Sequence, residues 1–221
     1  MRTSTNGASF VKKIKTDLGI HIELIDGDRE ADLIFKGVRS IANLDKGNHY
    51  IMDIGGGSVE YIHIENGHKK WAKSFNIGVG VLHNAFEKSN PLSSDDKINI
   101  EEFITSELAE LIDYHKNASC DKLIGASGSF EVVLSMNDLP LEDHATTMIS
   151  LNHYKDVAKE ILTTTYEERL NIEQIPDTRA KLIVVAIVLV NKTIEILNPA
   201  QLEVSPYALK EGLLSEVNSC R

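Results

Sequence analysis

The chain has 221 residues, of which 42% are hydrophobic and 25% charged, enough apolar surface for one large or two small domains. Acidic residues outnumber basic ones by 33 to 23, and the formal net charge of −10 argues against a nucleic-acid-binding surface. The longest apolar stretch, residues 182–190, is far shorter than the roughly 20 residues that cross a membrane. Two cysteines, Cys120 and Cys220, cannot form a disulfide framework. We therefore expect a cytoplasmic protein without a membrane or nucleic-acid partner.

The first 40 residues predict a helix, a strand and a second helix. Residues 8–18 read as a short helix that ends at Gly19, since glycine is favoured just after a helix. Residues 20–25 alternate apolar and polar side chains, which indicates a strand. Asp28 is a candidate N-cap of the next helix, whose apolar face carries Ala31, Ile34, Phe35 and Val38.

The next segment predicts three strands in series, residues 49–54, 59–65 and 68–77. Asn66-Gly67 separates the last two strands, and this dipeptide is typical of a two-residue hairpin turn. The rest is mostly helical: a long helix from residue 93 to about 115, a buried strand at 123–126, helices at 152–163, 165–170 and 176–197, a strand at 201–205 and a closing helix at 207–217.

This order of elements predicts an α/β fold with a mixed sheet flanked by helices. We place a boundary near residues 44–48, where Asp45-Lys46-Gly47-Asn48 reads as a linker.

The strongest chemical motif is the segment from Asp53 to Glu60. Asp53 ends a strand, Gly55, Gly56 and Gly57 follow, and Ser58 and Glu60 open the next strand. Consecutive glycines let the backbone approach an anion closely and direct several N–H groups towards it. An aspartate beside them can hold a divalent cation. An ordinary glycine-rich turn is the alternative, which the flanking acidic residues disfavour.

Two further segments are weaker when considered alone. Gly125, Ser127 and Gly128 form a loop between a buried strand and a helix, and a helix N-terminus favours an anion. The helix that begins at residue 28 carries Glu30, whose side chain on its own indicates no more than a favourable charge near a helix start.

Together these motifs resemble the exopolyphosphatase/guanosine pentaphosphatase family, which belongs to the actin-like ATPase superfamily with its ribonuclease H-like domains. Further matching residues occur in order, including Gly27, Gly37, Gly78, Arg179 and Gly212. The resemblance extends from about residue 1 to residue 217. It implies that residues 1–45 are a remnant of the first actin-like lobe and that residues 46–221 form the second lobe.

The resemblance also implies roles for individual residues. Glu30 matches the catalytic glutamate that activates water, and Asp53 and Glu60 match acidic residues that position a metal ion and water. The loops at residues 55–58 and 125–128 match phosphate-binding segments. The implied cofactor is Mg²⁺, held by Asp53 and Glu60.

Several positions depart from the family pattern. Arg29 and Asp32 replace an acidic residue and an arginine beside the catalytic glutamate. Val81 replaces a basic residue, and Ala186 replaces a glycine. The family's first phosphate loop has no counterpart in this sequence, so we expect the first 40 residues to be poorly covered and to favour a homodimer.

The expected reaction is hydrolysis of the terminal phosphoanhydride bond of inorganic polyphosphate. Guanosine pentaphosphate is the alternative substrate within the same class. A different class of function also stays open, namely a phosphate- or nucleotide-binding module that no longer catalyses turnover.

Overall fold

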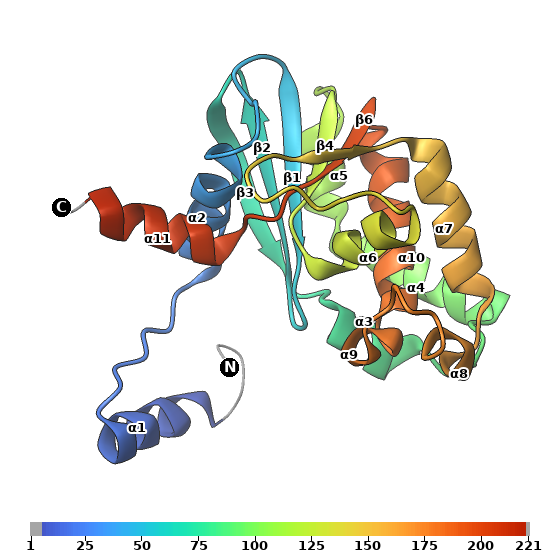
Figure 1. Ribbon diagram of the computed structural model, residues 1–221, viewed down its shortest axis with the longest axis horizontal. Coiled ribbons are helices and arrows are strands. Elements are labelled where there is room, and N and C mark those ends of the chain that lie inside the picture. Colours follow the sequence, from blue (N-terminus) through green and yellow to red (C-terminus); the bar gives the residue numbers. More distant parts are fainter. Residues whose placement is uncertain (1–5, 220–221) are drawn as a thin grey trace.

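The computed structural model describes residues 6–219 and centres on one mixed sheet (Figure 1). The strands lie in the order β3-β2-β1-β4-β6-β5. Strands β1, β2 and β3 pair antiparallel, β1, β4 and β6 pair parallel, and β5 returns antiparallel to β6. The strand bounds are Asn48–Ile54 (β1), Val59–Glu65 (β2), His68–Phe75 (β3), Lys122–Gly125 (β4), Thr147–Ile149 (β5) and Gln201–Val204 (β6).

Helices cover both faces of the sheet. On one face lie α2 (Gly27–Arg39) and α11 (Leu209–Ser219), and on the other a larger layer is centred on α10 (Ile183–Leu197) (Figure 1). Helix α10 buries ten of its side chains, including all of residues 183–190, which explains why the sequence of this first half is apolar on every side. The other helices are α1 (Gly7–Leu18), α3 (Val79–Phe86), α4 (Ser94–Glu107), α5 (Ala109–His115), α6 (Gly128–Met136), α7 (Leu151–Thr163), α8 (Tyr166–Arg169) and α9 (Asp177–Ala180).

The sheet alternates its side chains between two hydrophobic cores. Tyr50 and Met52 of β1 belong to the larger core under α10, whereas Ile51 belongs to the smaller core under α2. This alternation follows from the two-residue period of a strand. Both faces of β1 are therefore covered by hydrophobic core, and the strand is a rigid support for the loop that follows it.

The expected strand at residues 20–25 is wrong. This segment is extended but belongs to no strand among the described residues, and it links α1 to α2 (Figure 1). Alternation favours a strand only where a neighbouring strand supplies hydrogen-bond partners, and none does so here. Asp26 rather than Asp28 caps α2, since its carboxylate accepts a hydrogen bond from the Arg29 N–H at 2.8 Å.

Other expected elements are present with altered bounds. The long helix expected at 93–115 is divided at Leu108 into α4 and α5, and the one expected at 176–197 is divided near Leu182 into α9 and α10. Leu108 and Leu182 have ψ angles of 12° and −12°, which depart from the helical value. Helix α3 and strand β5 were not expected.

Helices α2 and α11 cross at very close range because each presents a glycine. A Cβ atom added to Gly37 would lie 2.0 Å from the Ala208 carbonyl oxygen, and one added to Gly212 would lie 1.8 Å from the Leu33 carbonyl oxygen. Such distances leave no room for any side chain. The two helices are therefore in backbone contact, although one lies near the start of the chain and the other near its end.

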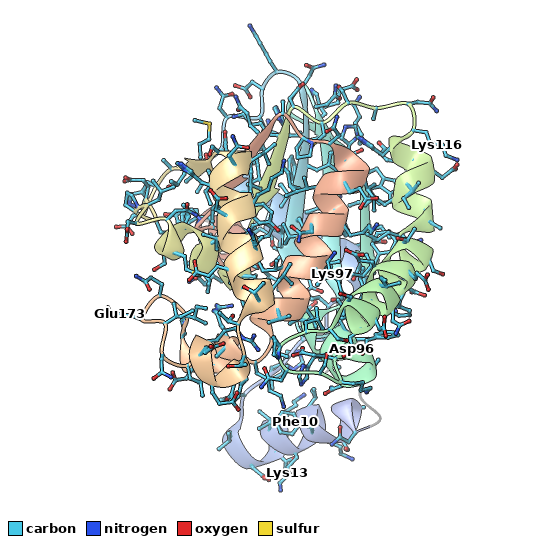
Figure 2. The ribbon with its side chains drawn as sticks, turned by 90° about the vertical axis from the view of Figure 1, so that its right-hand side faces the viewer. Phe10, Lys13, Asp96, Lys97, Lys116 and Glu173 are labelled. Carbon is cyan, nitrogen blue, oxygen red and sulfur yellow. The ribbon has the colours of Figure 1, made fainter. Side chains whose placement is uncertain are left out.

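Helix α1 lies apart from the body of the protein, at the far end of the extended segment (Figure 1). Figure 2 shows it beneath the helical layer, with Phe10 and Lys13 on it. Phe10 and Leu18 are 43% and 64% exposed. None of the helices in residues 6–219 is long and apolar enough to cross a membrane. Cys120 is a buried free thiol, while Cys220 lies outside the described residues.

Candidate phosphate site at the sheet edge

Two acidic residues face each other across neighbouring strands. Asp53 of β1 pairs directly with Glu60 of β2 in the antiparallel register, so both side chains lie on the same face of the sheet, with Cβ atoms about 5 Å apart. Glu60 is buried, and its carboxylate accepts a hydrogen bond of 2.6 Å from the Ser74 hydroxyl on β3. The two carboxylates are thus fixed side by side at the end of the hairpin.

A third carboxylate, Glu30 of α2, acts on this pair electrostatically. Burial, followed by the negative charges of Glu60 and Glu30, raises the pKa of Asp53 to about 7. A cation or a bound proton would relieve this accumulation of negative charge.

The glycine loop beside these carboxylates is held from one side only. The carbonyls of Gly55, Gly56 and Gly57 accept hydrogen bonds from Val79, Gly80 and Gly78, at 3.0, 2.8 and 3.2 Å.

Gly78 has to be a glycine here, since its Cβ would lie 2.5 Å from the loop backbone, whereas a Cβ on Gly56 or Gly57 would meet nothing within 4 Å. The open side of the loop leaves space for a ligand.

The second glycine loop lies at the same edge of the sheet. Met52 pairs with Gly125 across the parallel strands β1 and β4, and the Ala126 N–H donates to the Met52 carbonyl at 3.0 Å. Ala126, the first residue after β4, therefore lies beside Asp53 near the end of β1. The carboxyl ends of parallel strands are the usual position of ligand sites in α/β proteins.

Two features of the second loop favour an anion. The hydroxyl oxygen of Ser127 is buried and has no hydrogen-bond partner among the described residues, and buried polar atoms normally have one. The guanidinium of Arg179 lies directly against Gly128, where an added Cβ would be 1.7 Å from a guanidinium nitrogen. A positive charge thus adjoins the N-terminus of α6.

The structure thus brings Asp53 and Glu60 together beside the first loop, places Glu30 within electrostatic reach of Asp53, and places Ser127 and Gly128 on the adjacent loop. Gly125 differs from these, because its Cβ would lie 2.1 Å from the Phe130 ring. Internal packing therefore accounts for this glycine. The assignment of all these residues to catalysis or phosphate binding stays a prediction.

The sequence indicates no role for Ser74, and it marks Gly78 and Arg179 only as positions that match the family. Ser74 carries no local signal, since a serine in a strand is common. Arg179 reaches Gly128 only after the chain folds. These three residues respectively orient Glu60, support the first loop and place a charge at the second.

Arg29 and Asp32, the two neighbours of Glu30 that depart from the family pattern, form ion pairs with other elements. Arg29 donates to the Glu216 carboxylate of α11 at 2.7 Å, and Asp32 pairs with Lys69 of β3. Hydrogen bonds from Arg29 and Lys36 lower the pKa of Glu216 to about 2. These charges fasten α2 to its surroundings and so help to orient Glu30.

The donors at this site suit a hard cation. Within residues 6–219, no three His, Cys, Asp or Glu side chains are arranged to share one ion. Mg²⁺ needs only one or two protein carboxylates, because waters and substrate phosphates complete its shell. The paired Asp53 and Glu60 carboxylates fit that requirement.

The sheet order and the helices on both faces define an α/β protein with the actin-like ATPase fold. Within that class, the chain belongs to the Ppx/GppA phosphatase family, which matches residues 1–219.

Solved structures agree with this assignment. An exopolyphosphatase from Cytophaga hutchinsonii superposes with a TM-score of 0.92 and 32% identity, over 98% of this chain and 71% of that one. The Ppx/GppA family member of Aquifex aeolicus gives a TM-score of 0.82 and 26% identity, over 99% and 71%.

A curated relative, the guanosine-5'-triphosphate,3'-diphosphate pyrophosphatase of Vibrio vulnificus, is 28% identical over 219 residues. The match covers 99% of this chain and 43% of the relative, so the chain spans less than half the length of that relative.

Proposed function

We propose that this chain carries a site for hydrolysis of the terminal phosphoanhydride bond of inorganic polyphosphate. The observation that carries the proposal is the pairing of Asp53 with Glu60 across β1 and β2, beside a glycine loop whose outer side is open; the charge of Glu30 also acts on Asp53. The similar Cytophaga hutchinsonii protein is an exopolyphosphatase. Phosphoryl transfer depends mainly on positioning and charge neutralisation, and the residues gathered here can supply both.

Each group has a distinct task in this proposal. Glu30 orients the attacking water and accepts its proton, since it is the carboxylate supplied from outside the strand pair. The free side of the first loop receives phosphate oxygens through the backbone N–H groups of residues 56–58, since the Gly55 N–H already donates to the Ser58 carbonyl. Ser127 donates its unpartnered hydroxyl, and the Arg179 guanidinium stabilises the negative charge that develops on the phosphate.

Mg²⁺ is part of the proposal. Asp53 and Glu60 would hold the ion, and Ser74 fixes the orientation of Glu60 through its hydrogen bond. When bound, Mg²⁺ would neutralise phosphate oxygens and thereby favour attack by water. Burial and the neighbouring negative charges raise the pKa of Asp53, and a cation that offset these charges would be favoured here.

The metal assignment can be tested directly by calorimetry. Asp53→Asn removes one of the two carboxylates, and we expect Mg²⁺ affinity to fall about tenfold or more, because a hydrogen bond or contact to a charged group contributes about 1.5–3 kcal/mol. The matched control is Asp156→Asn on the exposed side of α7, which should bind Mg²⁺ like the parent. Equal affinity in Asp53→Asn and the control would contradict the assignment.

The reaction itself is tested by phosphate release from long-chain polyphosphate, with Mg²⁺ and with EDTA. We expect release only with Mg²⁺. Guanosine pentaphosphate is a second candidate substrate, because the Vibrio vulnificus relative is named for a guanosine pyrophosphatase activity. If phosphate were released from guanosine pentaphosphate but not from polyphosphate, the nucleotide would become the proposed substrate. Tight binding of either compound without release would support a binding module instead.

A further inference from the structure

A separate cavity lies at the other end of α3. It has a volume of about 220 Å³ and is enclosed by the C-terminal end of α3, the turn after it, α8 and the residue after α9. Figure 1 shows α3, α8 and α9 together at the same end of the molecule. Because a water molecule takes roughly 30 Å³ in the liquid, the space can hold several waters or a phosphate group.

The charge of this cavity is opposite to that of the protein as a whole. Lys88, Arg169 and Lys181 line it, and Glu87 is the one carboxylate among the residues that do so. Glu87 is already engaged, since its carboxylate lies 2.8 Å from the His83 ring nitrogen. In a chain with a formal net charge of −10, a local excess of positive charge favours an anion.

Arg169 is the central group of this cavity. Its side chain is only 1% exposed, and it donates from Nε to the Ala180 carbonyl at 2.8 Å and from Nη1 to the Thr164 carbonyl. A guanidinium has five N–H donors, so this pair of bonds leaves others available. No carboxylate of residues 6–219 lies within 4 Å of it. A buried charge without an opposite partner is costly.

Two carboxylates of α8 outside the lining favour the charge on Arg169 electrostatically, but they form their hydrogen bonds with other groups. Glu167 accepts a hydrogen bond from the Asn90 side chain at 3.0 Å, and Glu168 caps α8 through Thr165. Among the described residues, Lys88 and Lys181 also lack a carboxylate within 4 Å. Three cationic side chains therefore line one small space, and among the described residues no carboxylate forms a direct ion pair with any of them.

The cavity connects with the phosphate site through two short elements. Helix α3 begins at the glycines that hold the first loop and ends at the cavity, and its eight residues span about 12 Å. On the other side, Arg169 binds the carbonyl of Ala180, the residue after Arg179. The first glycine loop and the cavity therefore contact opposite ends of one short helix.

We propose that this cavity is a second phosphate-binding site, which takes a distal phosphate group of the condensed-phosphate substrate. The proposal rests on the proposed function for the identity of its ligand. Its chemistry is recognition of a phosphate oxyanion by Arg169, Lys88 and Lys181, and this holds whether the oxyanion belongs to a chain or is free inorganic phosphate.

The test uses the exposed lysines, because Arg169 also ties two backbone carbonyls together. Calorimetry should compare the parent, Lys88→Gln/Lys181→Gln and the matched control Lys155→Gln/Lys159→Gln, whose lysines are exposed on α7. Long-chain polyphosphate and inorganic phosphate are titrated separately. We expect the first double variant to bind long-chain polyphosphate about tenfold more weakly, given the strength of hydrogen bonds to charged groups, and the control to match the parent.

The two titrations separate the possible sources of the anion. Weaker binding of polyphosphate alone identifies a subsite for the chain, and weaker binding of inorganic phosphate identifies a site for the free ion. Affinities within twofold of the parent for both ligands would overturn the proposal. The binding measurement does not depend on turnover. If a chain without hydrolytic activity still bound phosphate through these lysines, the proposed hydrolysis would be refuted, whereas the proposed phosphate site in the cavity would stand.

Discussion

Glu30 reaches the candidate site from a helix, whereas Asp53 and Glu60 come from two paired strands. The strand pair is rigid because the register fixes both carboxylates. Glu30 depends on how α2 sits on the sheet, and Ala31 and Ile34, both buried in the smaller core, set that position. A small movement of α2 would therefore displace Glu30 without disturbing the other two.

This arrangement predicts the effect of Glu30→Gln. We expect phosphate release from polyphosphate to fall by about 10²- to 10⁴-fold, the usual contribution of a positioned general base. Polyphosphate affinity should stay within about twofold, since the glycine loops keep their N–H groups. The control is Glu107→Gln at the exposed end of α4. Turnover at the parental rate would leave Glu30 with no role beyond its charge near the helix start.

Part of the candidate site could be predicted from the sequence. The Asp53–Glu60 segment was recognisable because its acidic and glycine residues lie close together in the sequence. Glu30 and Arg179 were noted only through the family resemblance, because each approaches its loop through tertiary packing. The orphan hydroxyl of Ser127 is likewise invisible in a sequence, since burial is a property of the fold.

The contact between helices α2 and α11 tolerates little change in side-chain size, because the two backbones touch. Gly212→Ala should improve the intrinsic helix propensity by about 1 kcal/mol. Its Cβ would nevertheless lie 1.8 Å from the Leu33 carbonyl oxygen, and backbone cannot yield as a flexible side chain can. Overpacking typically costs about 1–3 kcal/mol.

We therefore expect Gly212→Ala to lower the free energy of unfolding by up to about 2 kcal/mol, the difference between these effects. Urea denaturation measures it. Leu213→Ala, at an exposed position of the same helix, is the control and should change stability by less than about 0.5 kcal/mol. A Gly212→Ala variant more stable than the parent would show that the helices separate easily.

The ion pairs between the same two helices predict a pH dependence. The pKa of Glu216 is lowered to about 2 by Arg29 and Lys36. Its contribution to stability is therefore complete above the ordinary glutamate pKa and is lost as the pH falls towards 2. Glu216→Gln should be less stable than the parent at pH 7, and this difference should shrink between pH 5 and pH 3.

Urea midpoints at several pH values measure this difference. Glu173→Gln provides the control, because Glu173 is exposed (Figure 2) and lies between α8 and α9, which are on the far side of the sheet from α11 (Figure 1). A difference between parent and Glu216→Gln that stays constant with pH would contradict the ion-pair assignment.

Most strands and helices were predictable because their periodicity is strong. The three strands of residues 48–75 and the buried α10 are examples. Residues 20–25 show the limit, since alternation reports which side chains are apolar and does not report whether a partner strand is present. Helix α3 was missed because the glycines at its start look like a loop, although they support the phosphate loop.

For the whole molecule, the isolated position of α1 predicts self-association. Phe10, Ile14 and Leu18 recur at four-residue spacing and form one apolar face, and Phe10 and Leu18 are well exposed. We expect light scattering to show concentration-dependent dimers, and Phe10→Ser/Leu18→Ser to shift them towards monomers. Lys12→Ser, on the polar side of α1, should have no effect. A parent that stays monomeric at all concentrations would contradict this expectation.

The contact between α2 and α11 also determines when the site can form during protein synthesis. Its ion pair joins residues 187 positions apart in the sequence. Ribosomes add about 5–20 residues per second, so α2 waits roughly 10–40 seconds for its partner. During that interval one flank of the helix that carries Glu30 is uncovered. The final position of α2, and with it that of Glu30, therefore depends on a segment synthesised much later, and a chaperone that shields the uncovered flank of α2 would act on the nascent chain before that segment arrives.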